Sequence, residues 1–218
     1  MRDKYEMQLR KLHAEMIEMG TMIEQAIETA IKALVAQDTE LAKKAIEADD
    51  AIDHQEREIE NLCLKLFLTQ QPVAGDMRNI SAALKMITDM ERIGDHASDI
   101  SELTLCMAGT PYIKKLEHIQ QMAKETMIML VKSIEAFVNK DIEEADSVIE
   151  RDDVVDDLFS KVKTELVQMI HENVDVGEQA TDLLMVAKYL ERIGDHATNI
   201  SEWVIFSITG THPREKGK

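Results

Sequence analysis

A heptapeptide that occurs twice constrains the fold of this chain more than any other feature. Residues 91–97 read ERIGDHA, and the same seven letters return at 191–197, an offset of 100. When the comparison is extended to residues 102 and 202, ten of twelve positions are identical. A match of this length indicates duplicated structural units rather than chance.

A second set of acidic residues supports the duplication. Three aspartates of the first half recur in the second half at an offset of 103. They are Asp38, Asp49 and Asp53, matched by Asp141, Asp152 and Asp156. The small change in offset fits in the turn before the last helix of each unit.

The composition and the spacing of turn residues predict helices. Aromatic residues make up only 4% of the chain, and Gly and Pro number 8 and 3, a mixture that favours helix over sheet. Asp38 and Asp141 are expected to cap the helices that follow them. Six long helices are predicted, at 3–37, 39–70, 74–107, 112–139, 142–171 and 176–208.

Helices of this length are typical of bundles, in which each helix buries an apolar stripe. We therefore expect an all-α fold of two tandem three-helix bundles related by internal duplication. The first bundle is predicted to span residues 1–110 and the second 111–209. Residues 210–218 are expected to be a disordered tail.

The net charge of −17 limits the classes of partner. It argues against nucleic acid, which is bound through Lys and Arg, and allows at most peripheral contact with an anionic membrane. The charged N-terminal segment does not resemble a signal peptide. Cys63 and Cys106 lie far apart and suggest neither a disulfide nor a zinc site. A cytoplasmic protein is predicted.

Paired carboxylates extend the apolar stripes of the predicted helices. Glu91 and Asp95 are four residues apart and therefore about 40° apart around a helix, and Asp99 continues the same side. Glu191 and Asp195 repeat this pattern in the second half. Because apolar residues precede both pairs at core spacing, the carboxylates should face neighbouring helices.

Further pairs occur on the second helix of each unit, Asp49 with Asp53 and Asp152 with Asp156. Two facing pairs would bring about four carboxylates together, and their repulsion and desolvation must be compensated. This compensation can come from protonation, from nearby Arg92 or Arg192, or from multivalent cations. One such pair is commonly a surface feature. Four pairs placed by duplication favour hard cations such as Mg²⁺, Ca²⁺, Mn²⁺ or oxidised iron.

The histidines and glycines of the repeated heptapeptide have more than one interpretation. His96 and His196 lie about 140° around the helix from Glu91 and Glu191, so an interface fits them as well as metal ligation does. The glycines at 94 and 194 fit close helix packing or a close approach to metal. No histidine has an acidic residue three positions before it, so the Glu-x-x-His motif of di-iron bundles is absent. The sequence offers no positive evidence for catalysis.

Three segments resemble the PhoU family of accessory proteins of phosphate-specific uptake. They are the duplicated ERIGDHAxxI, the QPVAGDMR of residues 71–78 and the ITG of residues 208–210. The resemblance implies two three-helix bundles that bind multinuclear metal clusters of iron, zinc, magnesium or manganese. It also implies negative regulation of phosphate-starvation signalling, through contacts with the ATPase of the phosphate ABC transporter and with a sensor histidine kinase. A homodimer is expected.

The resemblance also assigns metal ligands by position. The first cluster would use Asp49, Asp53, Glu91 and Asp95, and the second would use Asp152, Asp156, Glu191 and Asp195. Asp99 and its counterpart Asn199 are predicted as additional ligands. Because these two residues differ, the two sites need not bind the same number of ions.

Two other functions remain open at this point. One is a metalloenzyme that uses carboxylate-bound metals for hydrolysis or redox chemistry. The other is a metal-free helical scaffold whose acidic stripes dock basic partners.

Overall fold

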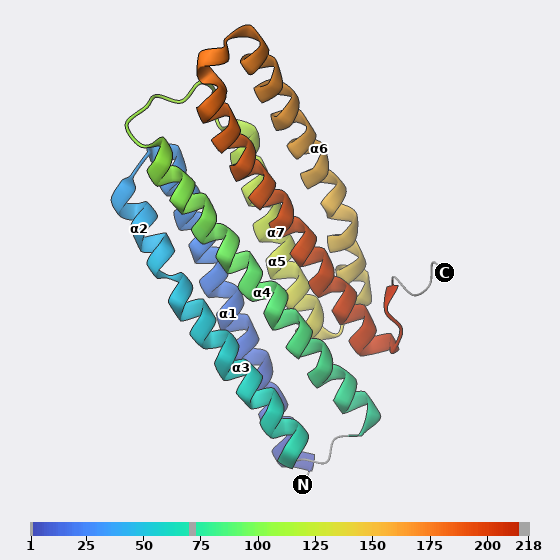
Figure 1. The fold of residues 1–218 in the computed structure, drawn as a ribbon. Coiled ribbons are helices and arrows are strands. Elements are labelled where there is room, and N and C mark those ends of the chain that lie inside the picture. Colours follow the sequence, from blue (N-terminus) through green and yellow to red (C-terminus); the bar gives the residue numbers. More distant parts are fainter. Residues whose placement is uncertain (1, 70–72, 214–218) are drawn as a thin grey trace.

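The structure of the chain, a computed structural model, is all-helical over the residues that it describes, 2–69 and 73–213. The elements are α1 (Arg2–Ala36), α2 (Thr39–Glu47), α3 (Asp49–Thr69), α4 (Ala74–Met107), α5 (Glu117–Asn139), α6 (Ile142–Glu172), the 3₁₀ turn η1 (Val174–Val176) and α7 (Gly177–Thr209). The long helices run alternately up and down one elongated bundle (Figure 1). The all-α fold built from two duplicated units is confirmed.

The two units join along their third helices. α4 closes the first unit and α7 closes the second, and the two helices run antiparallel side by side through the middle of the molecule (Figure 1). α1 and α5 also meet, because a Cβ placed on Gly20 would clash with Cδ1 of Ile134. One continuous apolar core therefore crosses from one unit into the other.

Two helix boundaries differ from those predicted from the sequence. The helix expected at 39–70 is divided at Ala48 into α2 and α3. The helix expected to begin at residue 112 begins at Glu117. The preceding segment is held by tertiary contacts instead, since the Tyr112 hydroxyl donates to the Leu34 carbonyl at 2.6 Å.

The predicted N-caps are confirmed at equivalent positions of the two units. The Asp38 carboxylate accepts from the backbone N–H groups of Glu40 and Leu41, both at 3.0 Å. The Asp141 carboxylate accepts from the N–H of Glu144 at 3.0 Å. Each cap satisfies N–H groups that have no partner inside the helix.

The end of the chain is described as far as Pro213. Gly210 adopts a left-handed φ of 78° and ends α7. His212 then packs against Trp203, with the ring centroids 4.7 Å apart. The first part of the predicted tail therefore has defined contacts, and residues 214–218 lie outside the described residues.

None of the described helices combines the length and the apolar character needed to cross a membrane.

Candidate metal centres

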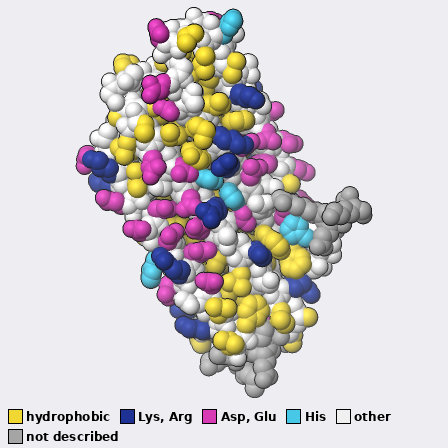
Figure 2. All heavy atoms as spheres, in the orientation of Figure 1, with side chains coloured by type: hydrophobic (Ala, Val, Ile, Leu, Met, Phe, Trp, Pro, Cys, Tyr) yellow, Lys and Arg dark blue, Asp and Glu magenta, His cyan; other side chains and the backbone are white. Residues whose placement is uncertain are grey.

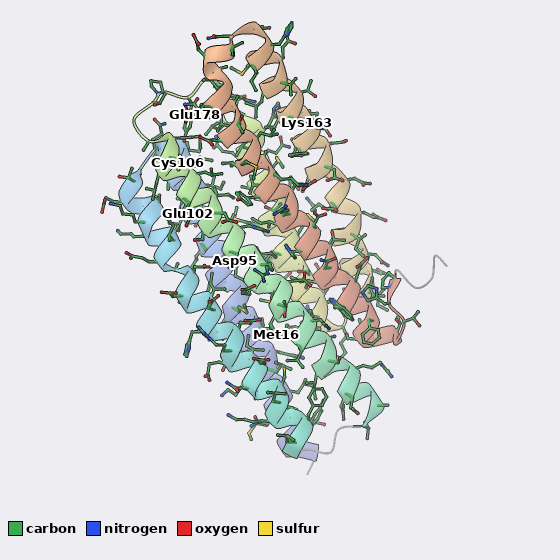
Figure 3. The ribbon with its side chains drawn as sticks, viewed as in Figure 1. Met16, Asp95, Glu102, Cys106, Lys163 and Glu178 are labelled. Carbon is green, nitrogen blue, oxygen red and sulfur yellow. The ribbon has the colours of Figure 1, made fainter. Side chains whose placement is uncertain are left out.

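The first acidic cluster consists of Asp49 and Asp53 on α3 and Glu91 and Asp95 on α4. One carboxylate oxygen from each of Asp49, Asp53 and Asp95 lies within 4.8 Å of the other two. Within residues 2–69 and 73–213, no other group of three potential ligands is as close. Figure 3 marks Asp95 at the middle of α4, beside the α3 helix.

Two oxygens of this cluster are buried without a hydrogen-bond partner, Oδ1 of Asp49 and Oε2 of Glu91. Burial, followed by the negative charge of Asp95 and then of Asp53, raises the pKa of Asp49 to about 6. The pKa of Glu91 is also raised, mainly by burial and next by Asp95. Buried carboxylate oxygens without a donor are costly, and a cation would satisfy them.

One cation of the chain lies at the rim of the first cluster. Nη1 of Arg92 is 2.7 Å from Oδ2 of Asp95, and its Nε is 3.5 Å from Oε2 of Glu91. The Arg92 side chain is 56% exposed, so solvent screens much of its charge. Arg92 therefore compensates the outer edge of the cluster and leaves its interior acidic.

The second acidic cluster consists of Asp152 and Asp156 on α6 and Glu191 and Asp195 on α7. Burial raises the pKa of Asp152 to about 6, with further contributions from Asp156 and Asp195. The pKa values of Asp156 and Asp195 are raised for the same reasons, burial first and then the charge of Glu191. The four carboxylates therefore share one electrostatic environment.

Lys188 distinguishes the second cluster from the first. Its ammonium group forms an ion pair with Oε2 of Glu191, and its Nζ lies 5.5 Å from the centroid of the Phe159 ring. The equivalent position of the first unit, at an offset of 100, is Thr88. The second cluster thus has its cation at a position where the first unit has threonine, whereas the cation of the first cluster is Arg92.

The helical glycines of the repeat bring the helices close together at both clusters. A Cβ on Gly94 would lie 3.1 Å from Cγ2 of Ile52 and 3.5 Å from Oδ1 of Asp49. A Cβ on Gly194 would lie only 2.9 Å from Oδ1 of Asp152. Glycine therefore leaves room for the carboxylate in the second cluster and for an apolar neighbour in the first.

Each of the two additional predicted ligands makes a polar contact outside the clusters. Oδ2 of Asp99 is 3.1 Å from Nδ1 of His96, although the charge of Asp99 still contributes to the raised pKa of Asp49. The Asn199 amide donates to Oδ1 of Asp89 at 3.1 Å. The structure thus groups the ligand atoms of three of the ten predicted residues, Asp49, Asp53 and Asp95. Glu91 and the four residues of the second set are close enough to influence the pKa values of their neighbours, and metal ligation by any of the ten remains a prediction.

The histidines of the repeat meet where α4 packs on α7. The rings of His96 and His196 have centroids 5.6 Å apart, and His96 also stacks on Tyr189 at 5.3 Å. Nδ1 of His196 lies 2.8 Å from Oδ1 of Asp89. Of the two interpretations of these histidines, their contacts support the interface. Asp89 and Tyr189 had no sequence signal, because these equivalent positions differ between the two halves.

Comparison with known families gives one match in each half of the chain. The family model described as "PhoU domain" matches residues 16–104 and 119–204. These two segments contain the two acidic clusters.

Curated relatives match over nearly their whole length. A protein from Clostridium acetobutylicum named "Phosphate-specific transport system accessory protein PhoU homolog" is 40% identical over 207 residues, which is 94% of each chain. A protein of the same name from Aquifex aeolicus is 35% identical over 97% of this chain and 98% of its own.

Solved structures show the same arrangement of helices. The crystal structure of PhoU from Pseudomonas aeruginosa superposes with a TM-score of 0.90 at 30% identity, covering 95% of this chain and all of that one. The phosphate transport system regulatory protein PhoU from Streptococcus pneumoniae gives 0.88 at 25% identity over 95% and 98% of the two chains.

Proposed function

The chain belongs to the PhoU family, and on that premise we propose that it regulates phosphate uptake and phosphate-starvation signalling as an accessory protein of a phosphate-specific transport system. The observation that carries this proposal is the match to relatives of that name over almost the whole of both chains. The family model also matches both halves of the chain, at residues 16–104 and 119–204.

The protein would act as an adaptor in the cytoplasm. It would contact the ATPase of the phosphate transporter and a sensor histidine kinase, and lower the expression of phosphate-responsive genes when phosphate is ample. Acidic side chains cover much of the middle of the face shown in Figure 2, and the net charge is −17. Such a surface complements basic patches on partner proteins. We propose no covalent chemistry, at most peripheral membrane contact, and a homodimer as the working assembly.

Each acidic cluster would hold metal ions in this account. Asp49, Asp53, Glu91 and Asp95 would ligate in the first unit, with Asp99 as a neighbour. The buried oxygens without donors support this assignment, as does the grouping of ligand atoms within 4.8 Å. A set of carboxylates alone suits hard cations, such as Mg²⁺, Mn²⁺ or oxidised iron, better than soft ones.

The second set would be Asp152, Asp156, Glu191 and Asp195, with Asn199 turned toward Asp89. The role of the metal would be structural and electrostatic. Bound cations neutralise carboxylates that otherwise repel one another across two helices, so they would hold α3 against α4 and α6 against α7. The surface offered to a partner would then depend on metal content.

A genetic experiment tests the regulatory role. The gene would be deleted in its host, and a reporter of a phosphate-starvation promoter would be measured in phosphate-rich medium. We expect the reporter to be active in the deletion strain and silent when the wild-type gene is returned. An unchanged reporter in the deletion strain would rule out negative regulation. The adaptor contacts are tested separately, by co-purification of the transporter ATPase and the kinase with the tagged chain.

A further inference from the structure

A cavity of about 260 Å³ lies where the first turns of α4 meet the ends of α5 and α7. Figure 1 shows the start of α4 and the end of α7 at the same end of the bundle. The cavity is lined from four helices, by Leu9, Asp76, Arg78, Asn79, Lys140 and Ser207, with Gly75 and Ile208 beside them. It is separate from both acidic clusters, and it connects the two units.

A largely buried asparagine lines this cavity beside an arginine. Asn79 is only 8% exposed, and it is one of the lining residues. Nε of Arg78 is buried without a hydrogen-bond partner. Buried polar groups are nearly always hydrogen-bonded. These two side chains therefore provide donors for a ligand.

The cavity is locally basic in a strongly acidic chain. Among residues 2–69 and 73–213, neither Arg78 nor Lys140 forms an ion pair. The acidic group on the lining is Asp76, and its Oδ2 accepts from the backbone N–H of Val73 at 3.3 Å. Two cations and one carboxylate leave a net positive charge, so an anion is favoured.

The start of α4 adds to this preference. The first intrahelical hydrogen bond of α4 runs from the N–H of Met77 to the carbonyl of Val73. The N–H groups of Ala74, Gly75 and Asp76 precede it and have no intrahelical acceptor. The positive end of the dipole of this long helix is thus beside the cavity, and helix N-termini commonly bind oxyanions.

Arg78 is held in place by the end of the second unit. A Cβ on Gly210 would lie 3.5 Å from Cδ and Nε of Arg78, so the arginine rests against the glycine backbone. The described part of the QPVAGDMR segment and the ITG segment, both recognised in the sequence, therefore meet at this cavity. Gln71 and Pro72 lie outside the described residues.

We propose that this cavity binds inorganic phosphate, through Arg78, Asn79 and Lys140 and the N-terminal end of α4. The features above select a small tetrahedral oxyanion, and the choice of phosphate among such anions rests on the proposed function. A bound anion would tie the start of α4 in the first unit to the ends of α5 and α7 in the second. The relative position of the two units would then respond to phosphate.

Calorimetric titration of the full chain with inorganic phosphate at constant ionic strength tests the proposal. We expect binding to wild type, and at least tenfold weaker binding to Arg78→Gln and to Asn79→Asp. The second substitution keeps the size of the side chain and places a negative charge in the cavity. Asn61→Asp adds the same charge at an exposed position of α3 and should bind phosphate as wild type does. Circular dichroism would check that each variant is folded.

Two further titrations distinguish phosphate binding in this cavity from binding at the first acidic cluster and from binding of oxyanions in general. A Glu91→Gln, Asp95→Asn variant should retain phosphate binding, because these residues belong to the first acidic cluster. Sulfate should bind more weakly than phosphate. The proposal would be overturned if wild type bound no phosphate, if Arg78→Gln and Asn79→Asp bound it as wild type does, or if sulfate bound more tightly. None of these results depends on the genetic test of regulation, so the two proposals fail independently.

Discussion

The two acidic clusters descend from one duplicated motif, but the charges around them differ. In the first, Asp49, Asp53 and Asp95 bring ligand atoms within 4.8 Å of one another, and Arg92 at the rim is largely exposed. In the second, Lys188 pairs directly with Glu191. The first cluster therefore relies more heavily on an external cation, and we expect it to bind metal more tightly than the second.

The comparison teaches that duplication preserved the paired carboxylates and changed the cations that compensate their charge. The four carboxylates have equivalents in both units, whereas position 88 is threonine and position 188 is lysine. At the contact between the units, Asp99 faces His96 while Asn199 faces Asp89. Differences of this kind would let one fold carry two metal centres of unequal affinity.

The largest expected effect comes from removing one cluster at a time. Asp49→Asn with Asp53→Asn should remove the metal of the first centre and leave the second occupied, and Asp152→Asn with Asp156→Asn should do the reverse. Amides keep the shape of the side chain and lose the negative charge that a hard cation requires. Metal content measured by mass spectrometry checks this.

The neighbouring exposed aspartates provide matched controls for these variants. Asp50→Asn and Asp153→Asn each remove one negative charge beside a cluster and should leave the metal content unchanged. If the control variants lost as much metal as the cluster variants, general surface charge would explain the binding.

The repeated glycines should differ in what an added methyl group disturbs. Gly194→Ala places a Cβ 2.9 Å from Oδ1 of Asp152, so we expect roughly tenfold weaker metal binding at the second centre, about 1.4 kcal/mol. Gly94→Ala presses mainly on Ile52, so metal binding at the first centre should change less. Metal titrations of the two variants compare them. Equal losses at both centres would contradict the account.

Exchanging the residues at positions 88 and 188 should reduce the difference between the clusters. Lys188→Thr removes the internal cation and should strengthen metal binding at the second centre, by about 1 kcal/mol or fivefold, the upper range for a partly exposed ion pair. Thr88→Lys should weaken binding at the first centre. Competition with a coloured chelator measures both changes, and a weaker second centre in Lys188→Thr would refute the role given to the lysine.

The smallest expected effect is on the pH dependence of stability without metal. In the folded chain the pKa values of Asp49 and Asp152 are raised to about 6, against about 4 in an unfolded chain. The metal-free folded state therefore holds more protons between these values, and its free energy of unfolding should fall as the pH rises through this window. Saturating Mn²⁺ should reduce the fall. Thermal melts from pH 4 to 7.5, with chelator or with metal, would show this loss of stability as a fall of a few degrees in the melting temperature. A rise in stability over that range with chelator would contradict the pKa shifts.

Much of the fold could be predicted from the sequence, because the repeat and the helical spacing are local signals. The division of α2 from α3 at Ala48 could not, since neither glycine nor proline marks it. The late start of α5 depends on distant residues as well, because Oε1 of Gln179 accepts from the backbone N–H of Ile113 at 2.7 Å.

The candidate sites, too, could be predicted only in part from the sequence. The pairs four residues apart lie on the sides of α4 and α7 that face α3 and α6. A second step of four residues adds another 40° of rotation, about 80° in all. Asp99 and Asn199 are thereby carried toward the contact between α4 and α7, where Asp89 and the histidines lie. Only the packing of the two units shows that this interface exists.

Equilibrium dialysis followed by elemental analysis tests the central claim most directly. Untagged wild-type protein would be dialysed against Mg²⁺, Mn²⁺, Fe³⁺ and Zn²⁺ in turn, beside a variant with amides at Glu91, Asp95, Glu191 and Asp195. The account predicts that wild type retains at least one ion per acidic cluster and that the variant loses them. If both proteins came out empty, the clusters would be docking surfaces for basic partners, and the claim that they are metal centres would be wrong.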